Sequence, residues 1–155
     1  MSDITKYFDD LNLGEKSSTA ARTVTEADIV SFAGLSGDYN PIHVDAAFAE
    51  NSPFKQRIAH GLLVLSIASG LFTNCELNLS IKNSLIALME VQCRFLKPVF
   101  IGDTIHVEVE IKEKKETSKP DRGIVIMERT VLNQKGDIVQ KIEAILMMRR
   151  RGENK

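Results

Sequence analysis

Two side chains that can exchange protons, the carboxylate of Asp38 and the imidazole of His43, lie five positions apart in a turn-rich segment. If residues 38–43 were fully extended, these side chains would start roughly 16 Å apart, too far to act on adjacent atoms of one substrate. The segment is instead dense in turn-forming residues, and Pro41 keeps Asn40 out of the helical region. The sequence therefore predicts a bend that brings Asp38 and His43 together.

A carboxylate and an imidazole on either side of a bend can hold one water molecule between them and act as an acid/base pair. Each well-placed proton-transfer group contributes about 10²- to 10⁴-fold to a rate. Simpler interpretations exist, because Asp38 fits an Asx turn and His43 could be a hydrogen-bonded structural histidine. A metal site made of His43, Asp45 and His60 is a further alternative, but their spacing matches no ligand signature. We therefore predict no metal ion and no cofactor.

The most apolar helix-like stretch, residues 61–73, follows this segment. Gly61 is expected to begin the helix, where backbone N–H groups lack partners and the helix dipole favours negative charge. Its missing side chain would let a substrate approach, whereas His60 is interpreted as a residue that introduces the helix. The polar exceptions Ser66 and Ser69 are small and can hydrogen-bond back to helix carbonyls. Because apolar residues surround the helix almost entirely, other structure must wrap it.

Apolar periodicity and turn formers predict the elements that position these residues. Thr25 and Asp28 have the spacing of a capping box, which predicts a helix over residues 26–35, and Asp45 is expected to cap a helix over residues 46–50. Strands joined by a polar loop at 116–122 and a hairpin turn at 134–137 are predicted over residues 84–99, 104–114, 123–133 and 138–148. Long strands packed on one buried helix make an α+β domain with an antiparallel sheet.

Length and charge limit the classes of function. A chain of 155 residues with 43% apolar content has room for one domain, here residues 1–155, with an N-terminal arm over 1–18 and a basic tail over 149–155. The formal net charge of −1 favours neither nucleic acid nor an anionic membrane, so a small molecule or a second copy of the chain is the expected partner. No apolar run is long enough to span a membrane, and residues 1–13 are unlike a secretory signal, which predicts a cytoplasmic protein.

Two further features are expected to be structural. Cys75 and Cys93 form no CxxC pair, so we expect buried free thiols rather than a disulfide or a metal clip. The basic tail is interpreted as a solvated chain end, with a contact to a ligand phosphate as the alternative.

Three ordered motifs carry a resemblance to a known family. They are GDYNPIHVD at residues 37–45, HG at 60–61, seventeen residues after His43, and RFLKPV at 94–99 leading to GDT at 102–104. Together they resemble the MaoC-like, (R)-specific enoyl-CoA hydratases, and the likeness extends over about residues 25–148. The resemblance implies a hot-dog fold, an antiparallel sheet wrapped round one long helix. It also implies addition of water to a trans-2-enoyl thioester of CoA or acyl carrier protein, or the reverse dehydration.

The resemblance also assigns roles to residues. Asp38 matches the base and His43 the proton donor, although a coupled pair could share these duties. The glycine matching Gly61 supplies an N–H to the thioester oxygen, Asn40 belongs to the substrate-binding motif, and Ser69 matches a serine near the catalytic pair. Two other classes remain as alternatives. A hot-dog thioesterase would need a carboxylate on or beside the central helix, and residues 61–73 contain none, while a non-catalytic acyl-thioester-binding subunit would need neither proton-transfer group.

The edge strands of the predicted sheet indicate that the chain assembles with a second copy of itself. The unpaired N–H and C=O groups of a sheet edge are usually covered, and no proline blunts the strands between Gly123 and Met148. We therefore expect an edge there to pair with a second copy in a two-fold homodimer or a dimer of dimers. In the family that this sequence resembles, the acyl-thioester channel lies at this interface.

Overall fold

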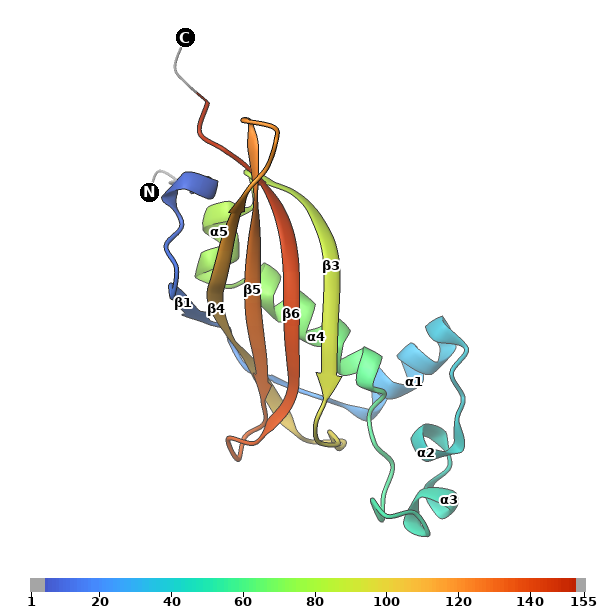
Figure 1. Cartoon of the computed structure of the whole chain (residues 1–155). Coiled ribbons are helices and arrows are strands. Elements are labelled where there is room, and N and C mark those ends of the chain that lie inside the picture. The colour runs from blue at the N-terminus through green and yellow to red at the C-terminus, as the bar shows by residue number, and fades with distance from the viewer. Residues whose placement is uncertain (1–4, 153–155) are drawn as a thin grey trace.

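The computed structural model describes residues 5–152, which form one antiparallel sheet with helices packed on one face (Figure 1). The strands are β1 (Lys16–Ser18), β2 (Arg22–Thr23), β3 (Leu85–Phe95), β4 (Thr104–Glu116), β5 (Arg122–Leu132) and β6 (Ile138–Arg149). The helical segments are η1 (Phe8–Asp10), α1 (Glu26–Ser36), α2 (Pro41–Val44), α3 (Ala46–Glu50), α4 (Gly61–Thr73) and α5 (Glu76–Ile81). The outer ends of the predicted arm and tail, residues 1–4 and 153–155, lie outside the described residues.

The order of strands is β1-β4-β5-β6-β3, with β2 also paired to β4. The strands β5 and β6 therefore occupy the middle of the sheet, and the expectation of an unpaired edge between Gly123 and Met148 is wrong. One edge is the short strand β1, and the other is β3, because this first long strand pairs with the last one, β6, rather than with β4. The order of the strands along the sequence does not reveal this pairing, because two strands that follow each other in sequence need not be neighbours in the sheet.

The central helix α4 packs against the sheet through one side, where Leu63, Val64, Ile67, Ala68 and Phe72 are buried. The hot-dog arrangement of a sheet around one long helix is thus present. The expectation that other structure wraps the helix on all sides is wrong for a single chain, because Leu62, Ser66 and Ser69 are exposed. The sheet of one chain covers only one side of α4.

The helices α1, α2 and α3 form a lobe beyond the end of the sheet (Figure 1). The capping box at the start of α1 is confirmed, since the Asp28 N–H donates to Thr25 Oγ1 at 3.3 Å and the Thr25 N–H donates to Asp28 Oδ2 at 2.8 Å. Gly37, at a φ of 76°, ends α1 in the left-handed region. Asp45 caps α3 as expected, because Asp45 Oδ1 accepts the Phe48 N–H at 2.9 Å.

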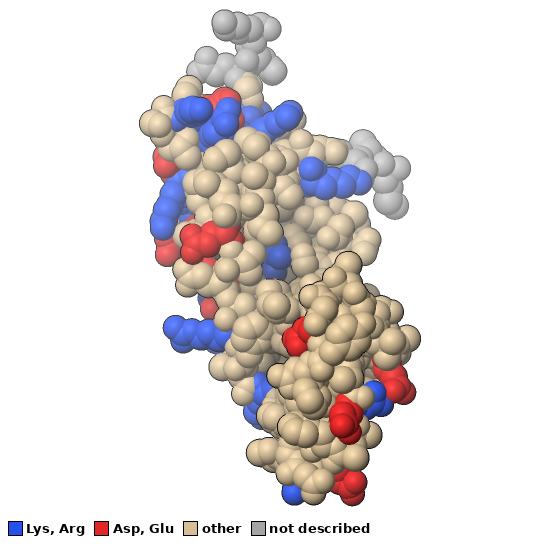
Figure 2. All heavy atoms as spheres, turned by 90° about the vertical axis from the view of Figure 1, so that its right-hand side faces the viewer, with Lys and Arg blue, Asp and Glu red and all other residues tan. Residues whose placement is uncertain are grey.

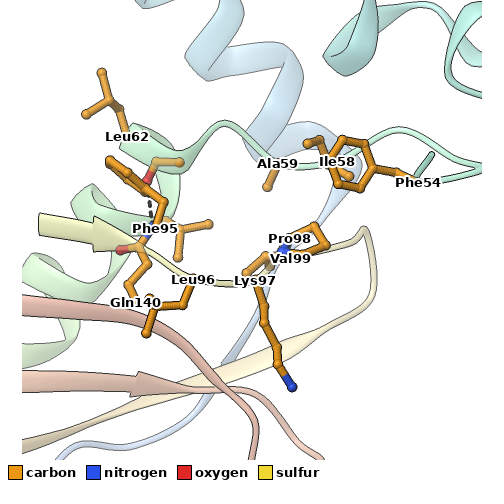
Figure 3. A pocket seen from close by; sticks show the side chains of 12 residues that line it. Phe54, Ile58, Ala59, Leu62, Phe95, Leu96, Lys97, Pro98, Val99 and Gln140 are labelled. Carbon is orange, nitrogen blue, oxygen red and sulfur yellow. Dashed lines mark hydrogen bonds between the residues drawn. The ribbon is translucent and has the colours of Figure 1, made fainter. Parts of the chain in front are cut away.

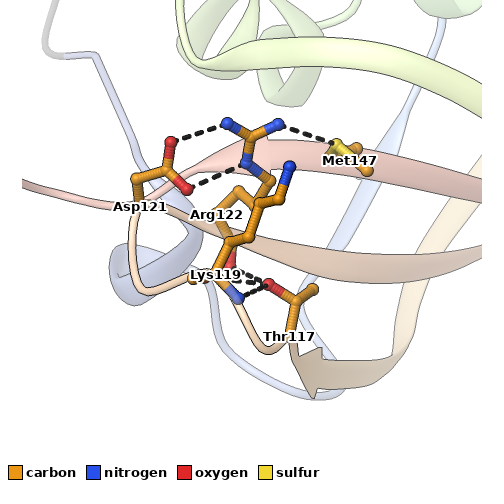
Figure 4. A network of polar contacts seen from close by, with 5 residues as sticks. All are labelled: Thr117, Lys119, Asp121, Arg122 and Met147. Carbon is orange, nitrogen blue, oxygen red and sulfur yellow. Dashed lines mark hydrogen bonds and ion pairs between the residues drawn. The ribbon is translucent and has the colours of Figure 1, made fainter.

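The polar loop between β4 and β5 and the turn between β5 and β6 lie where the sequence places them. In the loop, Thr117 Oγ1 donates to carbonyl oxygens and Arg122 forms an ion pair with Asp121 at 2.7 Å (Figure 4). In the turn, Gly136 has a φ of 79°. The short helix α5 was not predicted, because its six residues are too few to show a helical period.

Ion pairs join η1 to the residues that follow β6. Arg150 contacts Asp9 of η1 at 2.8 Å and Arg151 contacts Asp10 at 2.7 Å. The expectation that a frayed end begins at residue 149 is therefore wrong for residues 149–151, since Arg149 belongs to β6 and the next two arginines pair with η1, although Arg149 and Arg151 are exposed to solvent as predicted. The prediction of free thiols is confirmed for both cysteines, whereas the predicted burial holds for Cys75 and only in part for Cys93. Within residues 5–152, no helix has the length and apolarity needed to cross a membrane.

Arg129 of β5 is a buried cation in the apolar interior. It is 5% exposed, its guanidinium carbon lies 3.7 Å from the centroid of the Phe72 ring, and its Nε is buried without a hydrogen-bond partner in the described chain. Burial lowers the pKa of Arg129 well below its ordinary value, to about 10. Because the pKa is lower in the folded state, the charge destabilises the fold below pH 10, and stability rises as the pH increases above that value.

Replacing this cation should therefore stabilise the protein. The lowered pKa corresponds to a cost of about 3 kcal/mol for keeping the charged guanidinium in the folded state. The contact between the guanidinium and the ring of Phe72 offsets up to about 2 kcal/mol of this cost. We expect Arg129→Met, which keeps the apolar stem, to raise the free energy of unfolding by about 1 kcal/mol or more in urea denaturation at pH 7. Arg149→Met, on the exposed face of β6, is the control and should change it by less than about 0.5 kcal/mol. Destabilisation by Arg129→Met would show that the guanidinium has a stabilising partner.

Candidate active site

The turn after α1 brings the two proton-transfer groups together. A carboxylate oxygen of Asp38, a ring nitrogen of His43 and a ring nitrogen of His60 all lie within 4.8 Å of one another. Asp38 Oδ1 accepts the Asn40 N–H at 3.2 Å, which is the Asx-turn contact, and the side chain of Asn40 then caps α2. The bend is thus made by Asp38 itself, and its carboxylate stays exposed in the single chain.

The imidazole of His43 is held by the backbone. His43 Nδ1 lies 2.8 Å from the carbonyl oxygen of Ile58. Because a carbonyl oxygen can only accept, this nitrogen carries a hydrogen, and Nε2 is left to exchange protons. The contact fixes the direction in which His43 presents Nε2, as a general acid or base requires.

His60 introduces α4, as predicted, and also supports the pair. Its ring stacks on that of His43 with centroids 3.8 Å apart and planes at 26°, and it is 2% exposed. Its Nε2 lies 3.0 Å from the carbonyl oxygen of Asp38, so this contact ties the turn to the start of the helix. The sequence contained no signal for the stacking, because the two histidines are seventeen residues apart.

The arrangement of Asp38, His43 and His60 can be compared with the geometry that a metal site requires. His43 Nδ1 and His60 Nε2 already contact carbonyl oxygens, which leaves one nitrogen of each ring. In the stacked rings, the nitrogen lone pairs lie in nearly parallel planes and so do not converge on one point. A zinc ion lies about 2.0–2.1 Å from each nitrogen that binds it, on the line of that nitrogen's lone pair. The stack therefore suits proton transfer better than coordination of a cation.

Gly61 begins α4 next to this group, and no residue of the described chain accepts a hydrogen bond from its N–H. The partial positive charge of a helix N-terminus makes such a group a donor for a developing anion. A Cβ at this position would lie 2.6 Å from a ring carbon of Phe95, so only glycine fits beside the ring as it is placed.

A largely apolar groove of about 620 Å³ opens beside Gly61 (Figure 3). Its volume lies within the usual range for small-molecule sites. The residues that line it come from the segment before α4, from α4 itself and from the end of β3 with the segment that follows, and include Phe54, Ile58, Leu62, Phe95, Leu96 and Pro98. Phe95, Leu96 and Pro98 belong to the RFLKPV motif at 94–99. The sequence did not indicate that this motif lines a groove with Phe54, Ile58 and Leu62, because their approach depends on strand pairing.

Ser69 is not brought beside Gly61 by the fold of one chain. It lies eight residues after Gly61, which corresponds to about 12 Å along the helix, and it is exposed. Ser66 Oγ donates to the Leu62 carbonyl at 2.8 Å, as anticipated for that residue. Ser69 makes no such bond within residues 5–152, so its hydroxyl is available on the open side of α4.

Comparison with known proteins identifies the family. The family model described as the MaoC-like domain matches residues 10–132. The (R)-specific enoyl-CoA hydratase of Rhodospirillum rubrum is 35% identical over 149 residues, which cover 96% of each chain. The protein MaoC of Klebsiella aerogenes is 41% identical over 109 residues, which are 70% of this chain but only 31% of that protein. The chain belongs to the MaoC-like family.

Solved structures agree with this placement. A structure from Archaeoglobus fulgidus, described as a monoamine oxidase regulatory protein, has a TM-score of 0.89 and 39% identity, covering 96% of this chain and 97% of that one. A Mycobacterium tuberculosis protein described as a double hot-dog fold has a TM-score of 0.80 at 20% identity over 100% of this chain and 47% of that one. The second likeness shows the fold alone. The chain has the hot-dog fold that its sequence predicted.

Proposed function

We propose that this protein catalyses the addition of water to a trans-2-enoyl thioester, giving the (R)-3-hydroxyacyl thioester, or the reverse dehydration. The observation that carries the proposal is the approach of Asp38 and His43 to within 4.8 Å, beside a helix that begins with the free N–H of Gly61. The name of the Rhodospirillum rubrum relative, an (R)-specific enoyl-CoA hydratase that the chain matches along its length, supports the same reaction. The protein is thus an enzyme of the hydro-lyase class.

The proposed reaction needs three groups, and each has a candidate. Asp38 takes a proton from water as the water oxygen bonds to Cβ, and the π electrons move through Cα to the thioester oxygen. The Gly61 N–H stabilises the negative charge on that oxygen. His43, protonated at Nε2, then delivers a proton to Cα as the thioester carbonyl re-forms. Transfer of the proton from Asp38 to His43 through a water restores the enzyme, so one water is consumed in each turnover.

Asn40, Ser69 and the apolar groove are the other candidates for contact with the substrate. Asn40 shapes the turn that carries Asp38, and we propose that its side chain also faces the thioester. Ser69 is proposed to act from the open side of α4, against a second copy of the chain. The carrier is CoA or acyl carrier protein, and the apolar groove beside Gly61 offers room for part of the substrate.

A single assay with crotonyl-CoA separates this function from its rivals. We expect loss of the enoyl absorbance without release of free CoA, and chiral analysis should give (R)-3-hydroxybutyryl-CoA. Hydration in deuterium oxide should show syn addition, because both proton-transfer groups lie on one side of the site. Release of free CoA would indicate a thioesterase, an (S) product would contradict the assignment, and binding without turnover would indicate an acyl-thioester-binding subunit.

A further inference from the structure

The start of α4 lacks the usual side-chain cap. His60 occupies the N-cap position, but its side chain makes no capping hydrogen bond and instead contacts the Asp38 carbonyl. The first helical residue is Gly61, whose backbone is freer than that of any other residue type. The direction of the Gly61 N–H is therefore not fixed by a cap or by a side chain of its own. Contacts from outside the helix can therefore add to the helical hydrogen bonds that order this turn, such as that from the Val64 N–H to the His60 carbonyl at 3.1 Å.

Gln140 of β6 reaches this point from the sheet. It is 2% exposed, and its Nε2 donates to the Gly61 carbonyl oxygen at 2.8 Å (Figure 3). The thiol of Cys93 lies 3.7 Å from Gln140 Oε1, as a weak donor. A buried amide costs free energy unless it is hydrogen-bonded, and here both ends of the amide have partners.

Phe95 restrains Gly61 from a second direction. It is paired with Gln140 in the register of β3 and β6, and its ring occupies the space where a Cβ of residue 61 would lie. The amide of Gln140 holds the carbonyl of Gly61, while the ring of Phe95 covers its Cα. Both contacts come from paired strands of the sheet.

From this geometry we infer that Gln140 is a positioning residue, which fixes the direction of the Gly61 N–H by holding the Gly61 carbonyl. The inference rests on the proposed function, in which that N–H stabilises the thioester oxyanion. Loss of the amide lets the first turn of α4 move, and small misplacements of a catalytic group cost up to about 10²-fold in rate.

The test uses Gln140→Met, which keeps the length of the side chain and removes the amide, and Gln140→Leu as a second apolar variant. Gln134→Met is the matched control, because Gln134 is an exposed residue of the turn between β5 and β6 whose side-chain amide bonds Asp103 and Thr104. Two probes are compared by their Kd: butyryl-CoA, which carries no charge on its carbonyl, and acetoacetyl-CoA, whose enolate absorbs in the near ultraviolet. Turnover of crotonyl-CoA is measured in parallel.

We expect both Gln140 variants to lower kcat by about 10- to 10²-fold and to weaken binding of the acetoacetyl-CoA enolate about 10-fold. The Kd for butyryl-CoA and the KM should change by less than about threefold, and Gln134→Met should behave as the parent. Equal weakening of both probes would mean that Gln140 is merely structural, and unchanged kcat and enolate binding would also overturn the inference. If neither Gln140 variant folds, the amide is needed for stability and the positioning role is rejected. Failure of the unaltered protein to hydrate crotonyl-CoA would instead reject the proposed function.

Discussion

Asp38→Asn and His43→Ala should each lower kcat for crotonyl-CoA hydration by at least about 10²-fold while leaving the fold intact. Asn40 can keep its N–H contact with an asparagine at 38, so the first change removes the base without removing the turn. In the second, His60 loses its stacking partner, and His43→Gln therefore serves as a variant that fills more of the same space. Far-ultraviolet circular dichroism and urea denaturation check the fold.

The double variant distinguishes a coupled pair from two independent groups. If Asp38 and His43 act on one water, then removing both should be little worse than removing either. Asp121→Asn and His106→Ala are matched controls, because they make the same chemical changes in the β4–β5 loop and on β4. Near-normal turnover by both single variants would contradict the mechanism.

Local signals predicted the elements that carry the site. The alternation of apolar and polar residues predicted the strand β4. Its apolar residues Ile105, Val107, Val109 and Ile111 are buried. The capping box and Gly37 gave the bounds of α1 to within one residue. The bend between Asp38 and His43 was also predictable, because the residues that make it lie between them in sequence. These features depend on neighbours within a few positions.

Features that depend on distant segments were not predictable. The contact of Gln140 with Gly61 joins residues 79 positions apart, and the edge position of β3 depends on its pairing with the last strand. The ion pairs of Arg150 and Arg151 with η1 likewise join segments about 140 positions apart. Ser69 illustrates the difference between a feature set by sequence neighbours and one set by distant segments. Its place on α4 was predictable, but the open face around it became visible only with the packing of the sheet.

The exposed apolar surface of β3 is the structural basis for the last prediction, a homodimer. Apolar side chains on β3 are largely open to solvent, with exposed fractions of 51% for Leu88, 54% for Met89 and 39% for Val91. The side of the molecule that faces the viewer in Figure 2 shows extended uncharged surface between its charged groups. An edge strand of eleven residues with unpaired backbone groups is a template for pairing.

We propose that two copies pair through β3 and place the open face of α4, with Ser69, against the partner. An isologous contact of this kind satisfies the edge of both sheets at once and covers the apolar side chains. The exposed carboxylate of Asp38 would then be enclosed by the assembly, which would strengthen its interactions with a substrate. Activity should consequently depend on the dimer.

Light scattering at assay concentration should therefore give about twice the chain mass of 17.3 kDa, or a multiple of the dimer. Met89→Arg combined with Val91→Asp places charges in the proposed interface and should produce single chains whose kcat/KM is lower by at least about 10²-fold. Leu13→Arg is the control, because Leu13 is an exposed apolar residue next to β1, at the opposite edge of the sheet. It should leave both mass and activity unchanged. A fully active species near 17.3 kDa would rule out the dimer, since the site would then be complete in one chain.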